Sequence, residues 1–138
     1  QAAAKLMAEQ AGGGAIVNIA SILGERVAGK VAPYAISKAG LIQMTKALAL
    51  EWARHAIRVN ALAPGYVVTD INREFFAGDA GEALKKRIPM RRAGELDDLD
   101  GPLLLLCSDA GRYMTGAVVA VDGQNAHGQK VDGRETRD

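Results

Sequence analysis

The sequence predicts an α/β fold built on a parallel β-sheet, and two observations carry this prediction. Three short apolar runs rich in β-branched residues have the composition of strands covered on both faces; they are residues 15–20, 57–63 and 117–121. A segment of helix length separates the first two runs, so strand, helix and strand follow one another within about 50 residues. This succession favours a βαβ unit with parallel strands and a right-handed crossover.

The segments around these strands favour helices. Residues 1–11 are dense in helix-forming residues and stop at three glycines, as a helix C-terminus does. A long helix is predicted from Tyr34 to about Arg54, with Pro33 at or just before its first turn. Acidic residues at 95–98 precede the apolar run 102–107, and this pattern predicts a further helix.

The long segment 66–93 predicts a functional excursion from the fold. It mixes aromatic and charged residues with glycines and favours at most a short helix at 82–87. Loops of that length in compact domains are usually functional, so we expect this segment to cover a site. Four of its side chains suit an apolar lid: Tyr66, Ile71, Phe75 and Phe76.

Length and charge indicate one globular domain without a strong electrostatic preference for acidic or basic partners. The 138 residues are 49% hydrophobic and 24% charged, with 17 basic and 16 acidic side chains and a net charge of +1. No block of Lys and Arg predicts a nucleic-acid partner, and no apolar run reaches the roughly 18 residues of a membrane span. The single cysteine, Cys107, excludes an intrachain disulfide and is interpreted as a buried small apolar residue. We expect a cytoplasmic protein with no nucleic-acid partner, no membrane association and no metal site.

Tyr34 and Lys38 are the first candidates for chemistry. A spacing of four in a helix places the phenol and the ammonium on one face, one turn apart. A phenol ordinarily ionises near pH 10, so acid/base work at neutral pH needs positive charge nearby. Ser21 stands at the exit of the first strand, where open α/β sheets place ligands, and its hydroxyl could orient a substrate oxygen. On spacing and chemistry alone, a surface Tyr and Lys with a loop Ser is the simpler interpretation.

The wider context changes that interpretation. Ser21 is followed by Tyr34-Ala35-Ile36-Ser37-Lys38-Ala39-Gly40, then by Arg58-Val59-Asn60-Ala61-Leu62-Ala63-Pro64-Gly65 with Thr69, and then by Val121-Asp122-Gly123. In order and spacing these motifs resemble the C-terminal, catalytic half of the short-chain dehydrogenase/reductase family. The resemblance implies a Rossmann-like doubly wound parallel sheet, with the order helix, strand, helix, strand, lid, helix, strand. Residues 1–125 would be the C-terminal part of a single catalytic domain, and residues 126–138 a polar tail.

The resemblance also implies an activity and roles for particular residues. The activity would be NAD(P)-dependent transfer of a hydride between nicotinamide and a small-molecule alcohol or ketone. Tyr34 would be the general acid/base, Lys38 would hold the nicotinamide ribose hydroxyls and favour the phenolate, and Ser21 would hold the substrate oxygen. Family precedent places four further residues around the nicotinamide, with the Val67 backbone and the Thr69 hydroxyl at its carboxamide: Pro64, Gly65, Val67 and Thr69.

Some positions depart from the family pattern. The glycine-rich phosphate loop of the family has no counterpart here, because the glycines at 12–14 precede a strand instead of opening a helix. The residue that selects NAD or NADP would also lie upstream of Gln1. Asn18 and Asn60 match family positions inside strands, where we expect them to bond to neighbouring backbone. We expect the 138 residues to be inactive alone and to belong to an enzyme with another half; the alternative is a catalytically silent fragment or an oligomerisation scaffold derived from the same fold.

Two apolar stripes on the helix 34–54 predict self-association. One stripe contains Leu41, Met44, Thr45, Leu48 and Trp52, and the other contains Ala35, Ala39, Ile42, Ala49 and Ala53. A helix on the surface of a monomeric sheet needs only one apolar stripe. We therefore expect the second to be covered by residues 1–11 and by another copy of the chain, in a homodimer or homotetramer assembled through helices 1–11 and 34–54.

Overall fold

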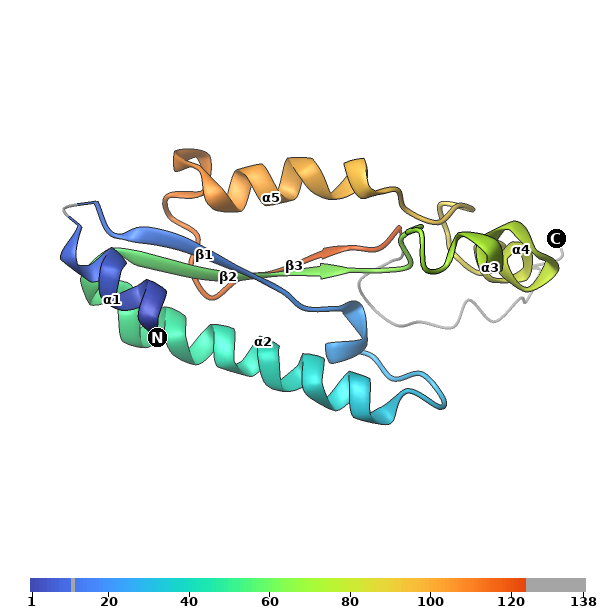
Figure 1. The fold of residues 1–138 in the computed structure, drawn as a ribbon, viewed down its shortest axis with the longest axis horizontal. Coiled ribbons are helices and arrows are strands. Elements are labelled where there is room, and N and C mark those ends of the chain that lie inside the picture. The colour runs from blue at the N-terminus through green and yellow to red at the C-terminus, as the bar shows by residue number, and fades with distance from the viewer. Residues whose placement is uncertain (11, 124–138) are drawn as a thin grey trace, which may run out of the picture.

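The centre of the fold is a three-stranded parallel sheet. The computed structural model describes residues 1–10 and 12–123, and its strands, in the order β1-β2-β3, are β1 (Gly14–Ile19), β2 (Ile57–Pro64) and β3 (Val118–Val121). Gly14 of β1 lies opposite Ile57, and Ala61 of β2 lies opposite Val118. The carboxyl ends of all three strands meet at one edge (Figure 1). The predicted strands are confirmed, with bounds that differ by at most one residue at each end.

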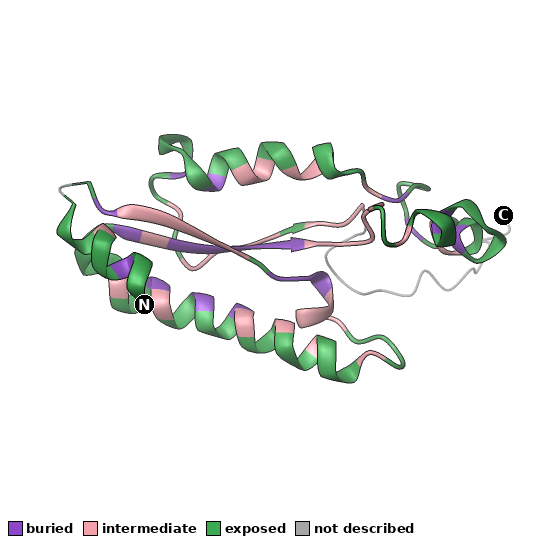
Figure 2. Ribbon diagram, viewed as in Figure 1, coloured by how far each residue is buried: buried purple, intermediate pink, exposed green. Residues whose placement is uncertain are grey.

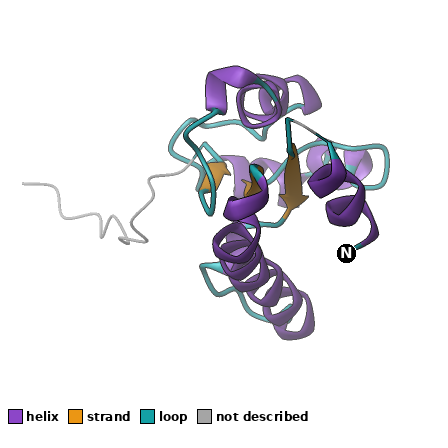
Figure 3. Ribbon diagram, turned by 90° about the vertical axis from the view of Figure 1, so that its left-hand side faces the viewer, coloured by secondary structure: helices purple, strands orange, loops and turns teal. Residues whose placement is uncertain are grey.

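Helices cover both faces of this sheet (Figures 1 and 3). α1 (Ala2–Glu9) and α2 (Ala32–Trp52) lie on one face, and α5 (Asp100–Cys107) lies on the other. Both crossovers step in the same direction across the sheet but pass over opposite faces, so they have opposite hands. Helices on both faces of a parallel sheet confirm the predicted α/β class. The short 3-10 turns are η1 (Ile22–Gly24), η2 (Ala53–His55), η3 (Leu96–Leu99) and η4 (Asp109–Gly111).

Two apolar clusters hold α1 and α2 against the sheet. In the first, Ala4 of α1 and Ala49 of α2 pack on Ile57 and Val59 of β2. The second cluster lies nearer the carboxyl ends of the strands and consists of Ala20, Ile42, Ala61 and Ala63. The central strand β2 is buried along most of its length, as a strand with a neighbour on each side and a helix on each face should be (Figure 2).

The face of α2 that meets the sheet combines members of both predicted stripes. Its buried residues are Ile42, Thr45 and Ala49, whereas Met44 is exposed. The predicted division into two stripes is therefore wrong. Spacings of three and four residues place the buried three in one row along the helix, and this row lies between the two stripes that the sequence favoured. The outer face still carries apolar side chains, of which Leu50 is 84% exposed.

The excursion after β2 contains two helices where the sequence favoured at most one. They are α3 (Arg73–Ala77) and α4 (Asp79–Lys85), so the helix predicted at 82–87 begins earlier and has a partner. Gly81 allows the contact between them, because a Cβ there would lie 2.4 Å from the Phe75 carbonyl oxygen. Of the predicted lid residues, Phe76 is buried and Ile71 is 99% exposed.

Two smaller expectations are wrong. Cys107 is exposed and not buried, because the apolar run in α5 covers more than one helical turn and only Leu106 of that helix is fully buried. The Asn18 amide donates a hydrogen bond of 2.9 Å to the Thr45 hydroxyl and not to backbone. Asn60 does bond to backbone, since its amide donates to the Met114 carbonyl at 2.9 Å and its oxygen accepts from the Ala117 N–H at 3.0 Å. The predicted tail, residues 126–138, lies outside the described residues.

Candidate active site

The candidate site residues follow the carboxyl ends of the three strands. Ser21 comes two residues after β1, Gly65 comes directly after β2, and Asp122 comes directly after β3. Parallel strands bring these ends to one edge of the sheet, which is where α/β proteins bind ligands. The first turns of α2, which carry Tyr34 and Lys38, reach the same end of the molecule (Figure 1).

Ser21 is buried and caps the turn η1. Its hydroxyl oxygen accepts a hydrogen bond of 3.1 Å from the Leu23 N–H, which leaves the hydroxyl proton available for another acceptor. Gly24, at the end of η1, lies directly against α2, because a Cβ there would be 2.8 Å from the Lys38 carbonyl carbon. A side chain at position 24 would push the Ser21 turn away from the helix that carries Tyr34 and Lys38.

Tyr34 and Lys38 lie together, as their spacing predicts. The Lys38 ammonium is 5.6 Å from the centroid of the Tyr34 ring, within the range of a cation–π contact. The same ammonium donates a hydrogen bond of 2.8 Å to the Ile19 carbonyl, the last residue of β1, so it links α2 to the strand that leads to Ser21. An ammonium has three donors, and two remain after this bond. The Tyr34 side chain is open to solvent, with 47% of its surface exposed.

The turn after β2 is held by the end of β3. The Gly65 N–H donates to the Val121 carbonyl at 2.9 Å, and a Cβ on Gly65 would lie 2.6 Å from the Asp122 Cα. Only glycine allows the two chain segments to approach this closely. Pro64, the last residue of β2, lies opposite Val121 in the sheet.

Val67 and Thr69 are held by Asn72, which the sequence reasoning missed. The Asn72 side chain donates to the Val67 carbonyl at 2.9 Å and accepts from the Thr69 N–H at 2.7 Å. Asn residues in turns favour such local hydrogen bonds, so the presence of an Asn at position 72 could have predicted this role. Val67 also forms a parallel bridge with Gly94, and it lines a different hollow from Thr69.

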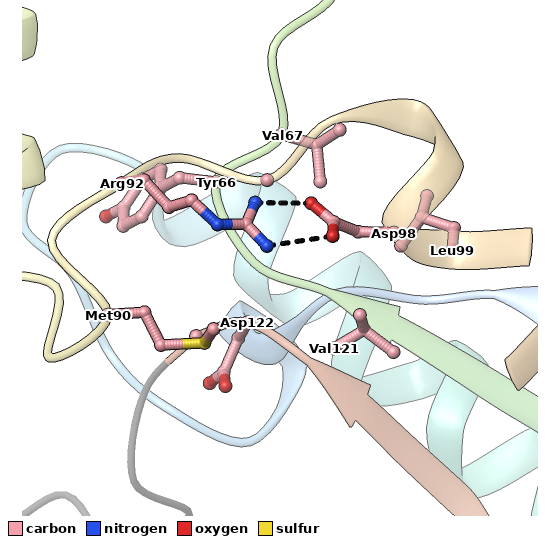
Figure 4. Close-up of a pocket in the computed structure, with 10 residues that line it drawn as sticks. Tyr66, Val67, Met90, Arg92, Asp98, Leu99, Val121 and Asp122 are labelled. Atoms are coloured by element: carbon pink, nitrogen blue, oxygen red, sulfur yellow. Dashed lines mark hydrogen bonds and ion pairs between the residues drawn. The ribbon is translucent and has the colours of Figure 1, made fainter. Parts of the chain in front are cut away.

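A cavity of about 230 Å³ lies beside Val67 and the end of β3 (Figure 4). On one side the Arg92 guanidinium donates two hydrogen bonds, of 2.6 and 2.9 Å, to the Asp98 carboxylate. These bonds, together with one from the Glu95 N–H, hold the pKa of Asp98 well below its ordinary value. The charges of Arg92 and Asp98 therefore compensate each other. Figure 4 shows that Met90, Val121 and Leu99 belong to the apolar part of the lining.

A second cavity, of about 460 Å³, lies on the other side of Tyr66. Tyr66 lines both cavities, and an ion pair joins their walls: Arg26 of the second lies 2.9 Å from Asp122 of the first. The Asp122 side chain is 5% exposed, so this pair ties the segment after η1 to the end of β3. Sequence reasoning had not singled out Arg26. Tyr34 and Lys38 line neither of these two cavities.

The described part of the chain holds no group of three or more His, Cys, Asp or Glu side chains that could bind a metal ion. Among the helices in that part, none combines the length and the apolar character that crossing a bilayer requires.

Comparison with known families agrees with this geometry. A family model described as enoyl-(acyl carrier protein) reductase matches residues 1–123. The chain is 44% identical to the 2-dehydro-3-deoxy-D-gluconate 5-dehydrogenase of Escherichia coli over 89% of its length, and 42% identical to the L-rhamnose 1-dehydrogenase (NAD(P)(+)) of Azotobacter vinelandii over the same share. It belongs to the short-chain dehydrogenase/reductase family. It spans about half of these relatives, 49% and 48% of their respective lengths.

Solved structures show the same fold. A short-chain type dehydrogenase/reductase from Mycobacterium marinum superposes with a TM-score of 0.81 at 40% identity, over 89% of this chain and 48% of that one. A gluconate 5-dehydrogenase from Burkholderia cenocepacia, in complex with NADP and tartrate, superposes with a TM-score of 0.74 at 38% identity, over 78% of this chain and 43% of that one. The sheet and its helices are therefore the corresponding part of a Rossmann-like fold.

Proposed function

We propose that the complete protein is an NAD(P)-dependent oxidoreductase that interconverts an alcohol and a carbonyl compound, with Tyr34 as the general acid/base. The observation that carries the proposal is the stack of Tyr34 and Lys38 at the carboxyl end of the sheet, with the Lys38 ammonium bonded to Ile19 two residues before Ser21. The named relatives are dehydrogenases, and one of the solved structures holds NADP.

Each residue of the proposed site has a separate task. When bound, the nicotinamide supplies or accepts the hydride at the substrate carbon. Tyr34 gives its phenolic proton to the substrate oxygen during reduction and takes that proton back during oxidation. The Lys38 ammonium stabilises the phenolate, and its two remaining donors suit the ribose hydroxyls. The Ser21 hydroxyl proton, free of the bond to Leu23, orients the substrate oxygen.

The turn after β2 fits the carboxamide end of the same coenzyme. Its backbone approaches closely at Gly65, and Asn72 orders the chain from Val67 to Thr69. The Asn72 side chain occupies one of the two acceptor positions of the Val67 carbonyl, and we assign the Val67 backbone together with the Thr69 hydroxyl to the carboxamide. Pro64 and Gly65 would lie against the ring.

The proposal also covers the location of the protein, its oligomeric state and the activity of residues 1–138 alone. Cys107 is an exposed free thiol, which suits the reducing cytoplasm. Exposed apolar residues on α2 suit a homo-oligomer. Without a glycine-rich loop for the pyrophosphate, residues 1–138 alone should have little or no turnover. The names of the relatives include both an acid and a neutral sugar as substrate, so they leave the charge of the substrate open.

Tyr34→Phe in the complete protein tests the acid/base assignment. We expect turnover to fall at least about a hundredfold, because the variant keeps the ring but loses the proton-carrying oxygen. Coenzyme affinity should change little. The measurement is nicotinamide absorbance during oxidation of a panel of sugar acids and neutral sugars, beside a coenzyme titration. Tyr113→Phe, at a fully exposed position away from the site, is the control. Turnover within about tenfold of the unsubstituted protein would mean that another group moves the proton.

A further inference from the structure

The second cavity, lined in part by Tyr66, lies between the segment that follows Ser21 and the chain at the end of α4. One wall comes from η1 and the segment after it, including Ile22, Leu23 and Arg26. The opposite wall comes from the end of α4 and the residues that follow it: Leu84, Arg87 and Ile88. Leu23, which lines this cavity, donates its backbone N–H to the Ser21 hydroxyl, so the cavity wall is bonded to the proposed substrate-orienting residue.

The described side chains that line this cavity carry positive charge and no negative charge. Among the described residues that line it, two are charged, and both are arginines; the others are apolar, apart from Tyr66. Arg26 is engaged with Asp122 at 2.9 Å. In the described part of the chain, no carboxylate lies within 4.0 Å of the Arg87 guanidinium. Arg87, which is exposed, therefore lines this cavity without a carboxylate partner among the described residues.

We propose that this cavity binds an anionic substrate, a hydroxy acid of the sugar-acid class, and that Arg87 pairs with its carboxylate. The proposal rests on the proposed function, because it concerns the substrate of the same site. A guanidinium presents two parallel N–H donors that match the two oxygens of a carboxylate, and a single guanidinium balances a single negative charge. The volume of the cavity, about 460 Å³, is sufficient for a six-carbon hydroxy acid.

A simpler role for Arg87 must be separated from this one. Lys85, Lys86 and Arg87 stand at the C-terminal end of α4, where positive charge is favourable without any ligand. Lys85 is paired with Glu82 at 2.8 Å, and Lys86 is exposed and lines neither cavity. Lys86→Ala therefore removes a positive charge from the same helix end without changing the cavity, and is the matched control for Arg87→Ala.

The test compares D-gluconate with D-glucitol, which differ in a carboxylate at one end of the same carbon chain. Titration calorimetry on the complete protein, with and without reduced coenzyme that cannot oxidise the probe, gives the affinity for each. We expect gluconate to bind about tenfold or more weakly to Arg87→Ala, with Lys86→Ala within about twofold and Arg87→Lys in between. Glucitol binding should be the same in all four proteins. Arg87 is exposed, so these substitutions leave the core intact.

The outcomes distinguish this inference from the proposed function. Equal gluconate affinity of Arg87→Ala and the unsubstituted protein, an equal loss in Lys86→Ala, or no gluconate binding at all would each overturn the inference, even if coenzyme-linked oxidation of neutral sugars were found. Gluconate binding that depends on Arg87, without coenzyme-linked turnover of any sugar acid, would instead support the anion site and contradict the proposed function.

Discussion

Lys38 is the residue that joins the separate parts of the candidate site. Its ammonium lies against the Tyr34 ring and is bonded to the last carbonyl of β1, and its backbone is in close contact with the Ser21 turn at Gly24. The helix spacing of four explains the first contact. The other two arise from the packing of α2 on the sheet, which brings residues from separate segments of the chain together.

Lys38→Ala should weaken both coenzyme binding and turnover, because two donors to the coenzyme and the charge beside the phenol are lost together. Two hydrogen bonds from a charged group correspond to about 3 kcal/mol, or roughly a hundredfold in the dissociation constant. Fluorescence titration of reduced coenzyme and steady-state turnover of the complete protein provide the two measurements. Lys46→Ala, at an exposed position on the same helix, should change neither. Unchanged coenzyme affinity in Lys38→Ala would contradict the dual role.

At the scale of secondary-structure elements, Arg58 links α5 to the sheet by hydrogen bonds. Its guanidinium leaves β2 on the face that α5 covers and donates to three carbonyls, those of Leu106 at 2.8 Å, Ser108 at 3.1 Å and Met114 at 3.4 Å. The last carbonyls of a helix have no partner within the helix, so a cation at this point satisfies them and complements the helix dipole. Nearby, the buried Asn60 holds the chain that leads into β3.

Arg58→Met should lower the free energy of unfolding by about 2 kcal/mol, because the variant keeps an apolar stem but leaves these carbonyls without a charged donor. Urea unfolding of the complete protein, followed by circular dichroism, measures the change. Arg112→Met provides the comparison, since the Arg112 side chain makes a single exposed hydrogen bond to the Asp109 carbonyl; that change should cost less than about 0.5 kcal/mol. Equal losses in the two variants would mean that Arg58 does not anchor α5.

At the scale of the whole molecule, the outer face of α2 carries exposed apolar side chains. Ile36, Met44 and Leu50 are exposed there, which is more apolar surface than a helix on a monomer needs. Ala49 is buried in the cluster with Ala4 and Val59, so it cannot contribute to a contact between copies, although the sequence placed it in the outer stripe. Ala53, at the end of the helix, is exposed and remains available.

Ala53→Glu should shift a homodimer or homotetramer of the complete protein toward smaller species, because the contact would bury an unpaired carboxylate. Light scattering coupled to gel filtration at micromolar concentration measures the mass of the assembly. Ala110→Glu, at an exposed position on the α5 side of the sheet, should leave that mass unchanged. A monomeric unsubstituted protein would contradict self-association through α2.

The features that were predictable from the sequence depend on residues close together in the chain. The strands appear as short apolar runs, and the Tyr34–Lys38 stack follows from a spacing of four in a helix. The motifs from Ser21 to Gly123 are sufficient to indicate the family and the parallel sheet, since order and spacing are properties of the chain itself.

Other features depend on which distant residues meet, and only the tertiary structure decided them. A local pattern does not specify that α5 covers the face opposite α2, nor that the row Ile42, Thr45 and Ala49 faces the sheet. Pairs such as Arg26 with Asp122, and Arg58 with the end of α5, join residues from separate elements. Arg87 became a candidate for substrate recognition because the cavity it lines contains no carboxylate among the described residues, and that absence results from folding. The physical reason is common to all of these cases: burial and charge compensation depend on the packed neighbours of a side chain, which the local sequence does not list.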